Sequence, residues 1–348
     1  MAKKGTTIKD VARRAGVSIA TVSNVINGTR FVSSELQQRV RKAAEELGYQ
    51  PSAVGRGLRK GKSYSIGVLL PDPRNQFFQI VAEGIEEQAE LHRHTIIYGN
   101  TRDEPSRERT CIAALASCGV DGIIIAPSPA GRENIGPYLK NGPPIVLVVR
   151  QIERFGADQV FADSVKGAYS ATQHLIELGH QRIGLLTGVR EVQTFKERLF
   201  GHQSALLDHS ILFDPSLVLD GYSRVKEGCE ATRFLLRNTD VTAIFATNYP
   251  MMLGALKAIN ELKLRCPEDV SLIGFDDLDC AVVLKPHLTV VDQKPFEIGH
   301  MAGSMLFERI NATAKTTQEA RTTRISPEMV IRESTAEPGG RRAGQQAL

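Results

Sequence analysis

The chain has 348 residues, of which 42% are apolar and 24% charged, which is typical of a globular protein with two or three compact units. Its longest apolar runs, such as that around Ile145, fall short of the ~18 residues that a membrane span needs. No apolar run follows the first basic residues, so we expect neither a signal peptide nor a membrane helix, and a cytoplasmic protein.

Charge is distributed unevenly along the chain. Residues 1–62 hold 13 Lys or Arg against 4 Asp or Glu, whereas the remainder holds 30 against 35. A basic segment on a mildly acidic body indicates a nucleic-acid-binding module, although a solvated basic tail would have the same charge. The five scattered cysteines and the pair His92 and His94 fit neither a disulfide framework nor a zinc site, so we expect no metal and no cofactor.

The first 49 residues predict three short helices around one core. Apolar residues at helical spacing mark the first helix, namely Ile8, Val11, Ala12 and Ala15. Gly16 then supplies a turn, and Ser18 is the expected N-cap of a second helix that buries Val22, Val25 and Ile26. A third helix is expected from Ser34, in a capping box with Gln37, to Gly48, with a buried side of Leu36, Val40, Ala43, Ala44 and Leu47.

The first two helices form a predicted helix-turn-helix, whose second helix lies in the major groove of DNA. Its exposed side carries the expected base-reading residues Ile19, Ala20 and Asn24. An asparagine can pair with adenine, and an apolar side chain can contact the methyl group of thymine. Polar residues expected to contact DNA around them are Thr7, Ser18, Thr21, Ser23 and Asn27.

The stretch TIKDVARRAGVSIATVSNVINGTRFVSSELQQRVRKAAEELGYQPSAVGRGL resembles the headpiece of the lactose/galactose repressor (LacI/GalR) family of bacterial transcription regulators. The V-S-x-x-T-V-S pattern begins at Val17, and Asn27-Gly28 and LGYQP follow, with likeness over nearly the whole chain. The resemblance implies a repressor that binds a palindromic double-stranded operator as a homodimer. It also implies control by a small sugar-like effector, either an inducer or a co-repressor.

The resemblance further implies a hinge helix within residues 50–62, which folds on the operator and inserts Leu58, preceded by Arg56, into the minor groove. Ser52 stands where the family commonly has Asn, and Gly55 where it has Ala. Each glycine weakens a helix by about 1 kcal/mol relative to alanine. We hypothesise a hinge that is disordered away from DNA and orders on binding.

Beyond the hinge, short apolar runs alternate with helical stretches, which predicts an α/β body of parallel sheets covered on both faces. The runs are YSIGVLLPD, HTIIYGN, VDGIIIAPS, PPIVLVVR, QVFADS, QRIGLLTG, VTAIFATN, VSLIGFDD and LTVVDQ. Nine strands exceed one small sheet, so we expect two doubly wound subdomains with ligands at the carboxyl ends of the strands. The family resemblance implies the same body, like a periplasmic sugar-binding protein with an effector in its cleft.

The expected organisation is a headpiece at 1–49, a hinge at 50–62, a body at 63–335 and a disordered tail at 336–348. Within the body, we expect an N-subdomain of about 63–163 and 294–323 and a C-subdomain of about 164–293 and 324–335. The tail contains no leucine heptads of the kind that form tetramers, which favours a dimer.

Strand ends and the family's pocket positions together select the candidate effector-binding residues. Sugar recognition uses planar arginine and carboxylate partners for hydroxyl groups and an aromatic face for the ring. The candidates are Asn75, Phe77, Phe78, Arg150, Thr194, Arg198, Tyr222, Asn248 and Asp276. For Phe77 and Phe78 a role in the core is an equal alternative.

Two departures from the family bear on the effector. Val149 and Tyr249 stand where relatives often have aspartate, while Arg150 and Arg198 remain and Lys196 is close in sequence. Fixed positive charge favours an anionic guest, so we hypothesise a sugar acid, a phosphosugar or a similar anion.

Two other classes of protein fit the sequence less well. A sugar-modifying enzyme is disfavoured because the chain has no G-x-S-x-G, H-E-x-x-H, Walker loop or Cys-His pairing. A cytoplasmic solute-binding or sensor protein is disfavoured by the attached headpiece.

Overall fold

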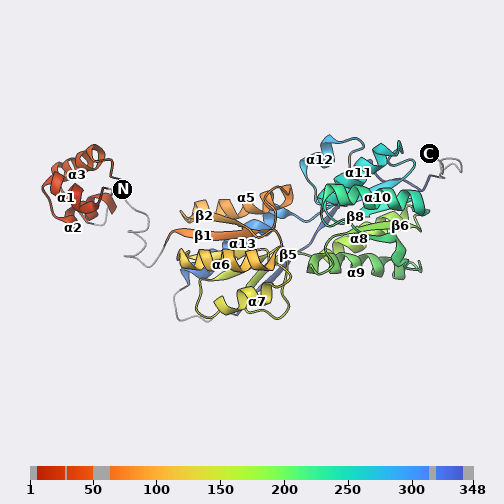
Figure 1. Cartoon of the computed structure of the whole chain (residues 1–348), viewed down its shortest axis with the longest axis horizontal. Coiled ribbons are helices and arrows are strands. Elements are labelled where there is room, and N and C mark those ends of the chain that lie inside the picture. Colours follow the sequence, from red (N-terminus) through yellow and green to blue (C-terminus); the bar gives the residue numbers. More distant parts are fainter. Residues whose placement is uncertain (1–5, 28–29, 50–62, 313–318, 340–348) are drawn as a thin grey trace. The chain divides into compact units, whose positions relative to one another are not determined.

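The computed structural model describes residues 6–27, 30–49, 63–312 and 319–339 (Figure 1). The chain divides into two compact units, Met1–Tyr64 and Ser65–Leu348. The predicted hinge with Arg56 and Leu58, and the side chain of Asn27, lie outside the described residues.

The first unit contains the three predicted helices, α1 (Ile8–Ala15), α2 (Ile19–Asn27) and α3 (Ser34–Glu46). Their shared core is small and apolar, consisting of Val11, Ala12, Ala15, Val22, Val40 and Ala43. Gly16 ends α1 with a φ of 65°, a conformation that glycine adopts without steric cost. The guanidinium of Arg39 on α3 donates to the carbonyl of Ala15 at 2.7 Å, which ties α3 to the end of α1.

Helix caps in this unit agree only partly with the sequence. The Oγ of Ser18 accepts a hydrogen bond from the N–H of Thr21 at 3.0 Å, as expected of an N-cap. The predicted capping box of Ser34 and Gln37 is wrong, because Ser33 is the N-cap and Gln37 instead donates to the carbonyl of Val32 at 2.9 Å.

A reciprocal cap is found at α1 instead. The carboxylate of Asp10 accepts from the N–H of Thr7 at 2.9 Å and from its hydroxyl at 2.7 Å. Leu36 is only half-buried and lies outside the described core, which corrects its predicted burial.

The second unit contains two six-stranded sheets. The first sheet is parallel, with strand order β11-β5-β4-β3-β1-β2. Its strands are β1 (Ser65–Leu70), β2 (Thr95–Asn100), β3 (Gly122–Ile125), β4 (Ile145–Val148), β5 (Asp158–Ala162) and β11 (Thr322–Ile325). Helices α5 (Gln76–Leu91) and α13 (Pro295–Asn311) cover one face, and α6 (Pro105–Ser117) and α7 (Gly131–Ile135) cover the other (Figure 1). The short helix η1 (Gly136–Tyr138) follows α7.

The second sheet has the order β12-β10-β9-β8-β6-β7, with β12 antiparallel to β10. Its strands are β6 (Ile183–Thr187), β7 (Val218–Asp220), β8 (Ala243–Ala246), β9 (Ser271–Phe275), β10 (Thr289–Asp292) and β12 (Glu328–Val330). Helices α8 (Ser164–Glu177) and α9 (Gln193–Asp208) pack on one face, and α10 (Val225–Asn238) and α11 (Tyr249–Glu261) on the other. The short helices η2 (Pro215–Leu217) and α12 (Asp279–Val283) complete this half.

All nine predicted strands are present, and the two doubly wound halves confirm the predicted fold class. Strands β7, β11 and β12 were not predicted. These strands are short and contain no fully buried residue, so they lack the apolar run that marks the others.

Two predicted boundaries need correction. Arg324 and Ile325 belong to β11 and pair with Phe161 and Ala162 of β5, so the chain leaves the first sheet after residue 325 rather than before 324. The predicted disordered tail begins too early, because the N–H of Ala336 donates to the Oγ of Ser271 at 3.0 Å and its carbonyl accepts from the same hydroxyl. Backbone hydrogen bonding therefore holds the chain to the second sheet beyond residue 335.

Helices α5 and α13 are in close contact through glycine. A Cβ at Gly299 of α13 would lie 1.9 Å from the carbonyl oxygen of Val81 on α5, and one at Gly84 of α5 would lie 2.3 Å from the carbonyl of Phe296. The two helices come from distant parts of the chain and together cover the first sheet, so this contact holds the crossover segment in place.

We predict that Gly299→Ala destabilises the chain by about 1 to 3 kcal/mol, because the overpacked helix pair must separate. This loss exceeds the gain of about 1 kcal/mol that alanine has over glycine in helix propensity. Urea unfolding measures the difference in free energy of unfolding between this variant and the wild type. Gly136→Ala is the control, since its Cβ would meet no described atom within 4 Å. Equal stability of the two variants would contradict the prediction.

Candidate functional site

A cavity of about 1140 Å³ lies in the second unit and is lined by residues that follow strands of both sheets. All nine residues predicted from strand ends and from the family's pocket positions line it, namely Asn75, Phe77, Phe78, Arg150, Thr194, Arg198, Tyr222, Asn248 and Asp276. Parallel strands bring their carboxyl ends to one edge of a sheet, which explains why residues far apart in sequence meet here. Lys196 is exposed and is not part of the lining, so it does not add to the charge of the cavity.

Arg198 of α9 is the most deeply buried cation of the cavity, with 4% of its surface exposed. One guanidinium nitrogen donates to the carbonyl of Thr247, and the other donates to the Oε1 of Gln293 at 2.9 Å. The guanidinium lies 4.0 Å above the ring centroid of Phe275. Burial lowers the pKa of Arg198 to about 10, so the group stays charged at neutral pH. Its Nε has no hydrogen-bond acceptor among the described residues.

Asp276 is the buried carboxylate that balances this charge. Its oxygens accept from the side-chain amide of Gln293 and from the N–H of Tyr249. Burial raises the pKa of Asp276, and the nearby Arg198 acts in the opposite direction. Gln293 therefore connects the two charges, since its carbonyl oxygen accepts from Arg198 while its amide donates to Asp276.

Gln293 was not among the predicted site residues. It follows β10 directly, so the strand-end argument used for the other candidates would have found it. Glutamine carries no charge and belongs to no motif here, which is why it was not singled out.

Several candidates also have structural roles. The side-chain oxygen of Asn75 accepts from the N–H of Phe77 at 3.1 Å and caps α5, and that of Asn248 accepts from the N–H of Met251 at 3.0 Å and caps α11. Phe77 and Phe78 are buried in the core against α13 as well as lining the cavity, with ring centroids 5.3 Å apart. The two phenylalanines therefore belong to the core and also line the cavity, and their contact with an effector stays a prediction.

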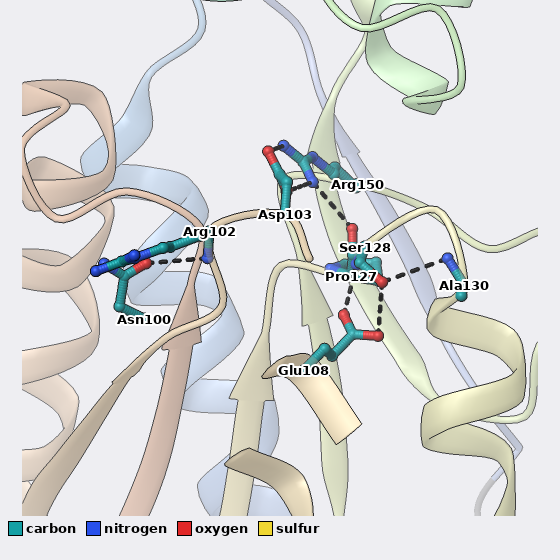
Figure 2. A network of polar contacts seen from close by, with 8 residues as sticks. All are labelled: Asn100, Arg102, Asp103, Glu108, Pro127, Ser128, Ala130 and Arg150. Carbon is teal, nitrogen blue, oxygen red and sulfur yellow. Dashed lines mark hydrogen bonds and ion pairs between the residues drawn. The ribbon is translucent and has the colours of Figure 1, made fainter. Parts of the chain in front are cut away.

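On the side of the first sheet, Arg150 follows β4 and forms a bidentate ion pair with Asp103, with Nη2 and Oδ2 3.1 Å apart (Figure 2). The same guanidinium donates to the carbonyl of Pro127 at 3.1 Å. The next residue, Ser128, donates its N–H and hydroxyl to the fully buried carboxylate of Glu108 on α6. This network extends from the cavity wall into the first subdomain.

Asp103 was missed because it lies in a loop rather than at a strand end. Its presence changes the interpretation of the cavity's charge. Six arginine or lysine residues and five acidic residues line the cavity, and the buried cations Arg150 and Arg198 each have an acidic partner nearby. The net positive charge of the cavity is therefore smaller than the sequence predicted from Arg150, Arg198 and Lys196 alone.

In the first unit, α2 presents the predicted side to solvent. Ile19 and Ala20 are exposed, and Asn24 is half-exposed. The polar candidates Thr7 and Ser18 are exposed, and Thr21 and Ser23 half-exposed. Thr7 and Ser18 also serve as helix caps through the hydrogen bonds described above.

A helix-turn-helix attached to a two-sheet ligand-binding body defines a ligand-responsive DNA-binding regulator. Residues 7–52 match the model for bacterial regulatory proteins of the lacI family, and residues 172–335 match the periplasmic binding protein-like domain. The HTH-type transcriptional repressor PurR of Haemophilus influenzae strain PittEE is 35% identical, covering 94% of this chain and 98% of the relative. The PurR repressor of Aliivibrio fischeri is also 35% identical, covering 95% of this chain and 98% of the relative. The chain belongs to the LacI family and is a DNA-binding transcriptional repressor with a ligand-binding domain.

Solved structures of LacI-family regulators have the same fold as this chain. The Lac repressor bound to ONPG in its repressed state has a TM-score of 0.83 and 26% identity, covering 95% of this chain and 100% of that one. A LacI family regulator from Enterococcus faecium with bound ribose has a TM-score of 0.70 and 31% identity, covering 78% of this chain and 99% of that one. Among the described residues, no helix is long and apolar enough to cross a membrane.

We predict that Gln293→Met destabilises the chain by about 3 kcal/mol, because Arg198 and Asp276 each lose one of their hydrogen-bond partners inside the protein. Urea unfolding followed by circular dichroism measures the loss. The matched control is Gln173→Met, which removes an exposed hydrogen bond to Glu177 and is expected to cost less than about 0.5 kcal/mol. A loss below about 1 kcal/mol in Gln293→Met would show that the two charges do not depend on the amide.

Proposed function

We propose that this repressor binds a palindromic operator as a homodimer and is controlled by a small sugar-like anion in the body cavity. The observation that carries the effector proposal is the buried guanidinium of Arg198, which lines the cavity with its Nε lacking an acceptor among the described residues. A buried donor without an acceptor costs free energy, and the charge of the guanidinium attracts polar and anionic groups of a ligand in the cavity.

The lining suits a ring with several hydroxyl groups. Arg198, Gln293 and Asp276 offer donors and acceptors, and the rings of Phe195 and Tyr222 offer apolar faces. Related structures are described with ribose, with ONPG and, for the regulator CelR, with cellobiose. These likenesses support a sugar-like effector, and the small excess of cations in the lining, six against five acidic residues, supports an anionic one.

An exposed apolar edge supports the homodimer. Strand β2 is the edge of the first sheet, and Ile97 and Tyr98 on it, with Leu91 at the end of α5, are exposed. Exposed apolar side chains on a sheet edge favour association with a second chain. Two copies related by a two-fold axis would present two headpieces, which matches a palindromic operator.

The mechanism we propose is a coupled equilibrium between effector and operator binding. An effector that changes the affinity for the operator by some factor must have its own affinity changed by the operator by the same factor. Measuring both affinities in the presence and absence of the other ligand tests this coupling. Unequal factors would contradict a simple two-site linkage.

The operator is tested with duplexes selected from random sequence by the purified full chain. We expect a palindromic consensus and a log affinity that falls steeply with log salt concentration, because lysine and arginine release counterions from phosphates. Absence of salt-sensitive binding to any duplex would contradict the proposal.

We predict that Asn24→Arg shifts the preferred base at one position of each half-site from adenine towards guanine, a change worth about 1 to 3 kcal/mol. Repeating the selection with the variant measures it. Arg190→Gln, a body residue paired with Asp220, is the control and should select the parental sites. Unchanged selection by Asn24→Arg would show that Asn24 does not read a base.

The effector is tested by calorimetry against sugars, sugar acids, phosphosugars and nucleobases, followed by operator-release assays with each binder. We predict that Arg198→Lys weakens the strongest binder at least about tenfold, since lysine keeps the charge but lacks the planar fork. Tight binding confined to neutral sugars would exclude the anionic effector.

A further inference from the structure

We propose that Asp103 occupies the anion-binding position at Arg150 in the unliganded chain and thereby sets the charge selectivity of the cavity. An effector carboxylate or phosphate would bind Arg150 by displacing Asp103. This inference rests on the proposed role of the cavity as an effector site, and it assigns a specificity-determining residue to that site.

The geometry at Arg150 is that of an occupied anion site. Both terminal nitrogens of the guanidinium are directed at the two carboxylate oxygens of Asp103 (Figure 2). This paired arrangement is the one in which arginine binds free carboxylates and phosphates. A third bond, to the carbonyl of Pro127, orients the guanidinium independently of Asp103.

Of the two partners, Asp103 is the one that can be exchanged. The side chain of Arg150 is 9% exposed, whereas that of Asp103 is 35% exposed. Arg150 lies two residues after the end of strand β4, while Asp103 lies in the short loop between β2 and α6. Solvent and solutes therefore reach the carboxylate more easily than the guanidinium.

The loop around Asp103 also has a strained backbone. Arg102 and Asp103 have φ values of 53° and 58°, in the left-handed region that residues other than glycine adopt at a steric cost, smaller for aspartate than for arginine. Within the loop, the N–H of Arg102 donates to Asn100, and that of Glu104 donates to the carbonyl of Thr101. The bond to Arg150 helps to hold this conformation, and its replacement by a ligand would release the loop.

The other cations of the cavity are less suited to select an anion. Arg198 is held by Thr247 and Gln293 on the other side of the cavity. Arg74 is fully solvated and pairs with Asp72 close by in sequence. Arg150 alone among the described lining residues combines a nearly buried guanidinium with a half-exposed carboxylate partner, so removal of that partner's charge changes the cavity most.

The test compares the wild-type chain with Asp103→Asn, using inorganic phosphate as the probe in calorimetry at constant ionic strength. Asparagine tolerates a left-handed backbone and keeps one oxygen as an acceptor, so the loop is expected to fold. We expect Asp103→Asn to bind phosphate at least about tenfold more tightly than the wild type, because the competing carboxylate is gone while Arg150 remains.

Two further variants identify the cause. The double variant Asp103→Asn with Arg150→Gln is expected to lose the gain, and Asp240→Asn, which removes a carboxylate from the pair with Arg182 outside the cavity, should bind phosphate as the wild type does. Unchanged, weaker or undetectable phosphate binding by Asp103→Asn would overturn the inference. A gain that persists in the double variant would overturn it as well.

Titration with galacturonate and galactose separates this inference from the proposed anionic effector. If the wild type binds only galactose and Asp103→Asn also binds galacturonate, Asp103 sets the selectivity and the anionic effector is excluded. If the wild type binds galacturonate and releases the operator while Asp103→Asn binds it no more tightly, the inference fails and the proposed effector class stands.

Discussion

The structure of the body depends on burying two opposite charges, Arg198 and Asp276, where the strands of the second sheet end. Neither charge could be buried by itself, because desolvation would cost several kcal/mol for each ion. Gln293 reduces this cost by bonding to both, and the carbonyl of Thr247 and the ring of Phe275 complete the surroundings of the guanidinium. The segment that follows Gln293 enters α13, so this network lies where the chain leaves the second sheet for the first.

The two sides of the cavity use arginine differently. On the second sheet, Arg198 reaches Asp276 through an amide, and its buried Nε has no acceptor among the described residues. On the first sheet, Arg150 is in direct contact with Asp103, and the pair is partly open to solvent. A preorganised donor and a competing carboxylate have different consequences, because the first contributes affinity and the second contributes selectivity.

Most of the fold and much of the site could be predicted from the sequence, for reasons visible in particular residues. Buried strands such as β3 and β4 consist almost entirely of Ile, Val and Leu, whereas β7, β11 and β12 lack a buried run and were missed. The ends of strands correctly predicted that Arg150 and Asp276 line the cavity. Asp103 was not predicted, because no local pattern indicates that a carboxylate in a loop pairs with an arginine 47 positions away. The helix-turn-helix was predicted well because its turn and caps depend on neighbouring residues.

The sequence by itself determined the family, the three-helix headpiece and the alternation of strands and helices, because these depend on local periodicity and on short motifs. Only the tertiary structure decided which arginines of the cavity have an acidic or polar partner that compensates their charge. The partners of Arg150 and Arg198 come from loops and strand ends that are distant in the chain, and folding brings them together at the carboxyl ends of the parallel strands of two sheets. Charge in a binding cavity is therefore set by pairing in space, since a cation bound to a neighbouring carboxylate attracts an anion far less than its position in the sequence suggests.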